Sequence, residues 1–439
     1  MTLSIFICLA AFVFLVWMIR RDRISLGLPI AYLFSLLLIH LPGAYAHVVG
    51  GGILLDTVLT ELGIGLTAIG AMCFVAGVWL ARFRAARGLI HRVADHHGFW
   101  LFCLIGGWLV TYGLSPLGGI PSIGAAVEKG GAVWILGVLL GLRAAMMRGD
   151  ATWAGIWLGA LAVYPVLMLL LGGFLSYGST AVIIALSVLT VSIRHNWRVV
   201  VGILVASILG FNFFLAYFKD RDEIRSAVWG GAGLEERIDV SMNMVNNFEW
   251  FDPTNETQLN SLDQRLNQNY FVGLTAERLR NGEVDYLYGR SLWEGLISLV
   301  PRAVWPDKPV YGGSPAIVTE MTGLMLSDTT SWGVGNVMEF YINFGTPSLV
   351  VGFLLLGWII GRLDYMAAVA EASGDLGKVF ILFLPAVALI QPNGSMVELT
   401  GGSAAALVAA YGWRWAWTRW STRRASPVIL PNRQTRRGP

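Results

Sequence analysis

The chain has 439 residues, of which 55% are hydrophobic and only 13% are charged, and its formal net charge is +3. Soluble proteins carry about 25% charged residues, so this composition excludes a soluble enzyme and a disordered chain. The weak and dispersed positive charge also excludes a nucleic-acid binder. Eighteen tryptophans and thirteen tyrosines suit a membrane–water interface. The composition therefore predicts a multispan integral membrane protein.

The apolar runs predict an all-α polytopic membrane protein with about eleven transmembrane helices. A helix needs about 20 apolar residues to cross the hydrocarbon core. The first run has arginines after it and none before it, which is typical of a transmembrane helix rather than a cleaved signal peptide. Runs of suitable length lie at residues 2–19, 26–42, 58–81, 98–114, 130–147, 153–172, 175–193, 198–218, 333–361, 377–392 and 398–418.

The basic residues predict how these helices are oriented. Loops that alternate onto one face hold most of the Lys and Arg, whereas the short segments of the opposite face hold only Lys129. Cationic loops stay in the cytoplasm. We therefore expect the N-terminus outside and the C-terminus inside.

These runs divide the chain into four parts. Residues 1–218 hold the first eight transmembrane helices, and residues 219–332 form one large extracytoplasmic loop. Residues 333–418 hold the last three helices, and residues 419–439 form a disordered, basic cytoplasmic tail. Long loops of this kind are often functional.

The large loop contains two helix signals. Residues 291–300 are apolar but too few to span, which indicates a re-entrant or interfacial helix. Residues 255–280 carry apolar side chains at spacings of three and four, which predicts an amphipathic helix packed on the membrane domain or in the interface. These side chains are Leu259, Leu262, Leu266, Tyr270 and Leu274.

Common catalytic motifs are absent from the sequence. There is no zinc-protease, nucleotide-phosphate or serine-hydrolase pattern, so we expect no metal and no cofactor. Cys8, Cys73 and Cys103 lie in apolar runs, where thiols behave as small hydrophobic groups. His40 and His47 lie near the outer end of the second span and could face a site, although core packing is the simpler interpretation.

The large loop is rich in cations. Arginine presents a planar fork of donors that suits phosphate oxygens. Arg302 stands out because it lies between the apolar run and the segment 305–309, in which two prolines fix the backbone. This pattern favours a rigid anion clamp made by Arg302 and Lys308, and the alternative is ordinary surface charge. The loop cations in question are Arg265, Arg278, Arg280, Arg290, Arg302 and Lys308.

A second candidate lies in the ninth apolar run. Glu339 and Asn343 are four residues apart and so share one face of a helix. An ionisable residue inside a membrane span is costly and is usually functional. We interpret Glu339 as a general base or a substrate contact, and the alternative is a polar pair in helix packing. Glu398 is a weaker candidate of the same kind.

These two candidates occur in an order that resembles a known family. Arg265 and Tyr288-Gly289 come first, P-R-A-V-W-P-D-K-P follows at 301–309, and E-F-Y-I-N-F-G follows at 339–345. This order is similar to the Wzy-type oligosaccharide repeat-unit polymerases of bacterial surface polysaccharides, the O-antigen and exopolysaccharide polymerases. The resemblance covers about residues 260–365.

The resemblance implies a metal-independent glycosyltransferase in the bacterial inner membrane, with a periplasmic N-terminus. Its partners would be polyprenyl-pyrophosphate-linked oligosaccharides, the bilayer and a chain-length regulator, with no nucleic acid. The growing glycan would move to the non-reducing sugar of a new lipid-linked repeat unit, releasing the carrier pyrophosphate at the outer face.

The resemblance also implies roles for particular residues. Glu339 would deprotonate the acceptor, Arg302 would hold the leaving pyrophosphate and Arg265 would orient a carrier. Substrate contacts are expected from Lys308, Arg290, Asn343, Trp305 and Tyr341.

Three other functions fit parts of the sequence. An O-antigen ligase would share the plan but transfer its glycan to a lipid core. An exosortase-type transpeptidase would need an outward cysteine, and the loop has none. A transporter or flippase should show paired broken helices or internal repeats, whereas the apolar runs here look unbroken.

Overall fold

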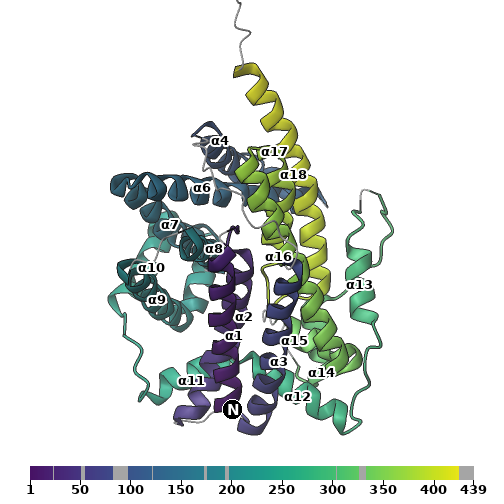
Figure 1. Cartoon of the computed structure of the whole chain (residues 1–439). Coiled ribbons are helices and arrows are strands. Elements are labelled where there is room, and N and C mark those ends of the chain that lie inside the picture. Colours follow the sequence, from purple (N-terminus) through teal and green to yellow (C-terminus); the bar gives the residue numbers. More distant parts are fainter. Residues whose placement is uncertain are drawn as a thin grey trace, which may run out of the picture.

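The computed structural model describes residues 1–22, 24–50, 55–82, 97–120, 122–172, 176–192, 197–302, 304–325 and 333–424. Across these residues every regular element is helical and no strand occurs. The basic segment 83–96 and the tail beyond residue 424 lie outside the described residues. Residues 419–424, predicted to belong to a disordered tail, instead continue helix α18. The N-terminus and the end of the last helix lie at opposite ends of the molecule (Figure 1).

Six of the described helical segments are long and apolar enough to cross a membrane, which fits a helical membrane protein; the expected total of eleven stays a prediction. They are Thr2–Asp22, Leu28–Val49, Thr57–Arg82, Ile123–Met146, Ala151–Leu170 and Thr346–Ser373. The elements are α1 (Thr2–Asp22), α2 (Leu28–Val49), α3 (Thr57–Arg82), α4 (His97–Trp108), η1 (Leu109–Gly113), η2 (Ser115–Gly119), α5 (Ile123–Gly131), α6 (Val133–Arg148), α7 (Ala151–Gly172), α8 (Ser176–Ser192), α9 (Trp197–Trp229), α10 (Leu234–Asn246), α11 (Glu256–Arg265), α12 (Gln268–Arg280), α13 (Arg290–Ser298), α14 (Gly313–Thr322), α15 (Asn336–Phe344), α16 (Thr346–Ser373), α17 (Leu376–Ala388) and α18 (Met396–Arg424).

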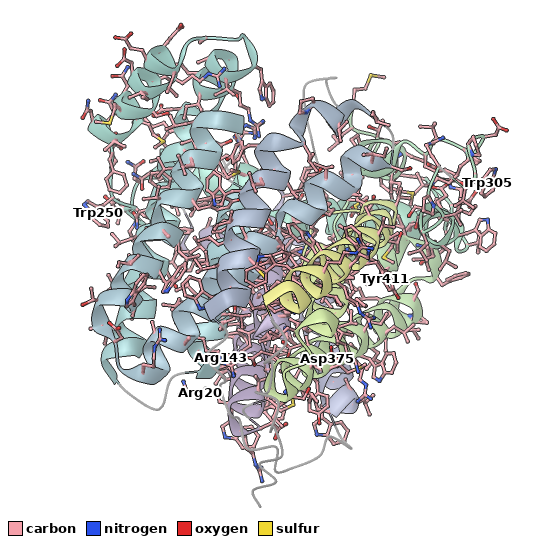
Figure 2. All side chains as sticks on the ribbon, turned by 90° about the horizontal axis from the view of Figure 1, so that it is seen from above. Arg20, Arg143, Trp250, Trp305, Asp375 and Tyr411 are labelled. Atoms are coloured by element: carbon pink, nitrogen blue, oxygen red, sulfur yellow. The ribbon has the colours of Figure 1, made fainter. Side chains whose placement is uncertain are left out.

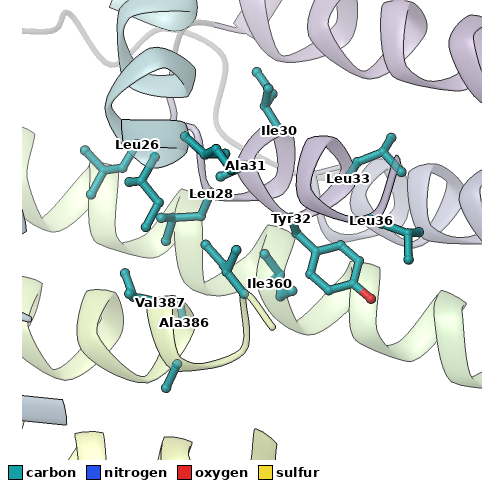
Figure 3. Packing of buried hydrophobic residues seen from close by; sticks show 14 of the residues in the cluster. Leu26, Leu28, Ile30, Ala31, Tyr32, Leu33, Leu36, Ile360, Ala386 and Val387 are labelled. Carbon is teal, nitrogen blue, oxygen red and sulfur yellow. The ribbon is translucent and has the colours of Figure 1, made fainter. Parts of the chain in front are cut away.

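The centre of the fold is a close pairing of α3 with α16. A Cβ atom on Gly77 of α3 would lie 2.2 Å from the carbonyl oxygen of Leu354, and one on Gly357 of α16 would lie 2.2 Å from that of Phe74. Such small residues let two helix backbones approach closely. Tyr32 of α2 packs into the same core, with Ile360 of α16 nearby (Figure 3).

Two buried ion pairs join helices that are far apart in sequence. Arg82, the last residue of α3, pairs with Asp364 of α16, and both side chains are buried. Asp364 also accepts hydrogen bonds from Ser25 Oγ at 2.6 Å and from the backbone N–H of Leu26 at 2.9 Å, so it fixes the turn between α1 and α2. Arg143 of α6 pairs with Glu371 of α16 at 2.9 Å.

Several of the predicted spans are broken, so the expectation of unbroken helices is wrong. The run 333–361 forms α15 and α16, separated at Gly345, where φ is 69°. Glycine adopts this left-handed region without the steric cost that a Cβ imposes. The run 377–392 forms only α17, which ends at Ala388, and the run 130–147 divides between α5 and α6 at Ala132.

Residues 219–332, predicted to form a large loop, contain helices that pack on the bundle. The amphipathic stretch 255–280 forms two helices, α11 on α2 and α12 on α3, so the packing prediction is confirmed but a single helix is wrong. The contact with α3 is close, since a Cβ on Gly273 would lie 1.9 Å from the carbonyl oxygen of Leu59. The short apolar run forms α13, which packs along α18.

Candidate functional site

The candidate site surrounds the start of α15. The segment 389–395, which joins α17 to α18, covers this helix end. The backbone N–H of Gly335 donates to Asn393 O at 3.1 Å, and that of Asn336 donates to Pro392 O at 2.9 Å. The hydroxyl of Tyr32 donates to Asn336 Oδ1 at 2.6 Å. The start of α15, the irregular segment 389–395 and α2 therefore meet inside the bundle.

Glu339 lies one turn into α15 and is fully buried. Its Oε2 accepts a hydrogen bond from the backbone N–H of Met396, the first residue of α18, at 2.6 Å. Its Oε1 makes no well-formed hydrogen bond within the described residues, and the hydroxyl of Ser291 lies close to the carboxyl. A buried polar atom without a partner costs about 1–3 kcal/mol, and more when charged. Such an atom in a folded protein calls for a functional explanation.

Asn343 holds the preceding loop beside Glu339. Its Oδ1 accepts from the backbone N–H of Gly289 at 3.0 Å. Its Nδ2 donates to Ser291 Oγ at 2.9 Å and to the carbonyl oxygen of Glu339 at 2.7 Å. The two residues do share a helix face, as predicted, but Asn343 positions the start of α13 and has no free polar group.

The first turn of α18 is closed by its own side chains. Ser395 Oγ accepts from the backbone N–H of Glu398 at 3.3 Å, and Glu398 Oε2 accepts from the backbone N–H of Ser395 at 3.0 Å. This reciprocal pair is a capping box. Glu398 Oε1 also accepts from Ser314 Oγ at 3.0 Å. These bonds explain Glu398 as a structural residue, and its S-x-x-E spacing is visible in the sequence.

Helix α13 links the buried carboxyl to the cationic turn. Gly295 packs on Met396, and Ser298 Oγ donates to Val397 O at 3.1 Å. On the outer side of α13, burial raises the pKa of Glu294, the nearby Arg290 lowers it and Glu320 raises it further. The contacts of Gly295 and Ser298 thus pack α13 on the first turn of α18, where Met396 binds Glu339.

The turn after α13 carries the two cations of the predicted clamp. Arg302 Nη1 donates to the carbonyl oxygen of Lys308 at 2.9 Å. Lys308 Nζ donates to the carbonyl oxygens of Val300 at 2.9 Å and Ser298 at 3.4 Å. Carbonyl oxygens do not neutralise a positive charge, and no ion pair joins either cation to a carboxylate in the part of the chain that the structure describes. Burial and the neighbouring Arg302 lower the pKa of Lys308.

These cations line an apolar pocket of about 870 Å³ between the turn, α5 and α18. Glu339 is not among its lining residues, so the structure does not place Glu339 and Arg302 in one cavity. Met396, whose N–H binds Glu339, is nevertheless followed directly by Val397, which lines the pocket. The lining residues include Val110, Leu114, Ile123, Ala126, Gly130, Ser298, Leu299, Val300, Arg302, Val304, Lys308, Val397, Gly401, Ala405, Val408, Ala409, Gly412, Trp413 and Ala416.

The other predicted site residues lie outside this pocket. Arg265 ends α11 with its guanidinium 6.0 Å from the ring of Phe218, away from the elements around Glu339. Arg290 pairs with Glu320 and lies 3.9 Å from Glu294. Trp305 is exposed at the edge of the molecule (Figure 2).

Tyr341 is half-buried on α15, close to Tyr286. It is not among the residues that line the pocket beside α18.

A separate polar cluster involves the two histidines. His47 Nε2 lies 2.8 Å from Asp263 Oδ1, and His40 Nδ1 lies 2.7 Å from Asn269 Oδ1. Asp263 and Asn269 are buried and belong to α11 and α12. Sequence reasoning missed both, because a polar residue on an amphipathic helix resembles an exposed one. The cluster fixes the loop helices onto α2 and α3.

Comparisons with protein-family models, with curated proteins and with solved structures found no match. No group of three or more His, Cys, Asp or Glu side chains that could hold a metal ion occurs within the described ranges.

Proposed function

We propose that this chain is a membrane glycosyltransferase that polymerises polyprenyl-pyrophosphate-linked oligosaccharide repeat units, as the Wzy-type enzymes do. The main support for the proposal is an apolar pocket lined by two cations, Arg302 and Lys308, that pair with no carboxylate in the described residues. The pocket starts at Val397, directly after Met396, whose N–H binds the buried carboxyl of Glu339. An apolar pocket beside cations suits a lipid-linked phosphate, and a carboxyl with a free oxygen suits proton transfer.

The proposed step transfers the growing glycan between two carriers. The bond between the anomeric carbon of the growing glycan and its diphosphate oxygen breaks, and polyprenyl diphosphate leaves with the electron pair. The acceptor hydroxyl of the new repeat unit forms a bond to that carbon and gives its proton to Glu339. The products are one elongated lipid-linked glycan, one polyprenyl diphosphate and one proton.

The residues predicted from the sequence would support different parts of this step, from inside and outside the pocket. Arg302 and Lys308 would stabilise the negative charge that grows on the leaving diphosphate. Asn343 would act as a positioning residue, because it accepts from the backbone N–H of Gly289 and donates to the carbonyl oxygen of Glu339. Arg265 and Arg290 would act further from the reacting bond, since Arg290 already pairs with Glu320.

The proposal includes the predicted arrangement in the membrane. Eleven spans, a periplasmic N-terminus and a cytoplasmic C-terminus in the bacterial inner membrane would place the lipid-linked substrates at the outer face. The six long apolar helices and the opposite positions of the two ends of the bundle support this arrangement.

The residue roles are tested by a chain-length assay in membranes that contain the full chain and its lipid-linked repeat units. Glu339→Gln keeps the shape of the side chain and removes its base, so polymerisation should fall by about 10²–10⁴-fold. Glu283→Gln is the matched control, because Glu283 is exposed and pairs with Arg278.

The variants should retain the wild-type melting temperature in detergent, which separates lost chemistry from lost fold. Normal polymer length in Glu339→Gln would remove that residue from the mechanism. Normal polymer length in Arg302→Ala would do the same for the proposed clamp.

A transporter of lipid-linked glycans is a second candidate, favoured by the broken helices. Helix pairs α15–α16 and α17–α18 are each interrupted, and the segment between α17 and α18 contacts the start of α15, one turn before the buried carboxyl of Glu339. Transporters often bind substrates at such sites. Movement of lipid-linked repeat units across vesicles without a longer product would support it, whereas a ladder formed from repeat units alone would exclude both a transporter and a ligase.

A further inference from the structure

We infer that the pocket beside α18 selects its lipid substrate by the length of a single hydrocarbon chain, accepting chains that extend beyond one membrane leaflet. This inference rests on the proposed function, because it assigns the lipid part of the same substrate. It rests on three features of the pocket: its length, its charge and its open side.

The length of the pocket exceeds the depth of one leaflet. Its lining residues follow one face of α18 from Val397 to Ala416. At about 1.5 Å per residue, this stripe is roughly 28 Å long. The hydrocarbon core of a bilayer is about 30 Å thick, so one leaflet accounts for about half of that. A chain that fills the pocket is therefore longer than the acyl chains of a bilayer phospholipid.

The positive charge of the pocket lies beside the first turns of α18, where it suits an anionic head group. Lys308 Nζ donates to Ser298 O at 3.4 Å, and Ser298 Oγ lies 2.5 Å from Thr400 Oγ1. The remaining wall is apolar apart from a few polar atoms. This polarity fits a phosphate head with one long chain that runs towards Trp413 and Ala416.

The pocket is also open enough to admit a chain from the side. Val408 lines it and is 55% exposed. A Cβ on Gly412 would meet no atom within 4 Å, so the space beside this residue is free. A larger side chain at either position would fill the pocket without displacing the backbone of α18.

Binding of two diphosphate lipids to the purified full chain in nanodiscs tests this inference. The probes are undecaprenyl diphosphate and farnesyl diphosphate, which have the same head and differ in chain length. Bilayer tails are as apolar as the pocket wall, so the preference comes from packing contacts that only the long chain makes along the whole pocket. The wild type should therefore bind the long chain at least about tenfold more tightly. Val408→Trp and Gly412→Leu should lose most of that preference.

The control is Leu407→Trp, which adds a similar bulk at the neighbouring exposed position, outside the pocket lining. It should keep the preference for the long chain. Equal binding of both probes by the wild type, or an unchanged preference in both pocket variants, would overturn the inference. Displacement of undecaprenyl diphosphate by an equal amount of dioleoyl phosphatidylglycerol would also overturn it.

The glycan ladder separates this inference from the proposed function. A chain-length preference without any ladder would reject the polymerase and keep the pocket assignment. A normal ladder in both pocket variants, with no preference for chain length, would reject the pocket assignment and keep the polymerase.

Discussion

Arg302 and Lys308 bring two positive charges into one short turn, where carbonyl oxygens accept their hydrogen bonds and no carboxylate pairs with them in the described segments. Partial burial and the neighbouring charge of Arg302 both lower the pKa of Lys308. Both favour the neutral amine, so the pKa of Lys308 lies below its ordinary value of 10.5. The anion site that we propose at this turn would therefore bind with a strength that depends on pH.

Binding of undecaprenyl phosphate should consequently weaken at alkaline pH. Lys308 is charged below its pKa, so affinity should begin to fall at a lower pH than an ordinary lysine would give. Arg302→Gln removes one cause of the lowered pKa and should move this fall to higher pH, although overall binding is weaker. Lys308→Arg should abolish the fall. An unchanged alkaline fall in Lys308→Arg would show that another group titrates.

At the same scale, the sequence predicted which residues share a helix face better than it predicted which residues they contact. The spacing of Glu339 and Asn343 placed both on one face of a helix, which the structure confirms. The partners of Asn343 lie about fifty residues earlier, at Gly289 and Ser291. Periodicity along one helix contains no information on such distant contacts, so the contacts of Asn343 with Gly289 and Ser291 were not predictable.

Among the elements, the start of α18 determines how Glu339 is presented. Ser395 caps this helix, and the next residue, Met396, donates its N–H to Glu339. Ser395→Ala should cost about 1 kcal/mol of stability and loosen this first turn. Hydrogen exchange at Met396 and Val397 should become faster, whereas Ser395→Thr should preserve both stability and exchange. Unchanged exchange in Ser395→Ala would show that the cap does not hold this turn.

The interruptions between helices could not be predicted from hydropathy. Apolar residues continue through Gly345 and through Leu389, so the runs 333–361 and 377–392 look like complete spans. The breaks come from a left-handed glycine at Gly345 and from contacts between α15 and the segment 389–395. Both causes depend on tertiary packing. Helices α1 and α3 were predicted well because nothing interrupts their apolar runs, whereas α2 continues through Pro42 to Val49, beyond the predicted end at residue 42.

At the scale of the whole molecule, the buried pair of Arg82 and Asp364 connects the N-terminal and C-terminal parts of the bundle. Removing one partner of such a pair costs about 3–5 kcal/mol, because the other charge stays buried alone. Asp364→Leu should therefore lower the melting temperature of the detergent-solubilised chain strongly. The double variant Arg82→Leu with Asp364→Leu should recover part of this loss, because no unpaired charge remains but the hydrogen bonds of Asp364 to the α1–α2 turn stay lost. A double variant as unstable as the single one would contradict this account.

The most direct test of the central claim is reconstitution of the purified full chain in vesicles with lipid-linked repeat units as the only substrate. The account predicts a ladder of longer lipid-linked glycans, with one polyprenyl diphosphate released for each bond formed. Movement of intact repeat units across the bilayer with no ladder and no released diphosphate would contradict it.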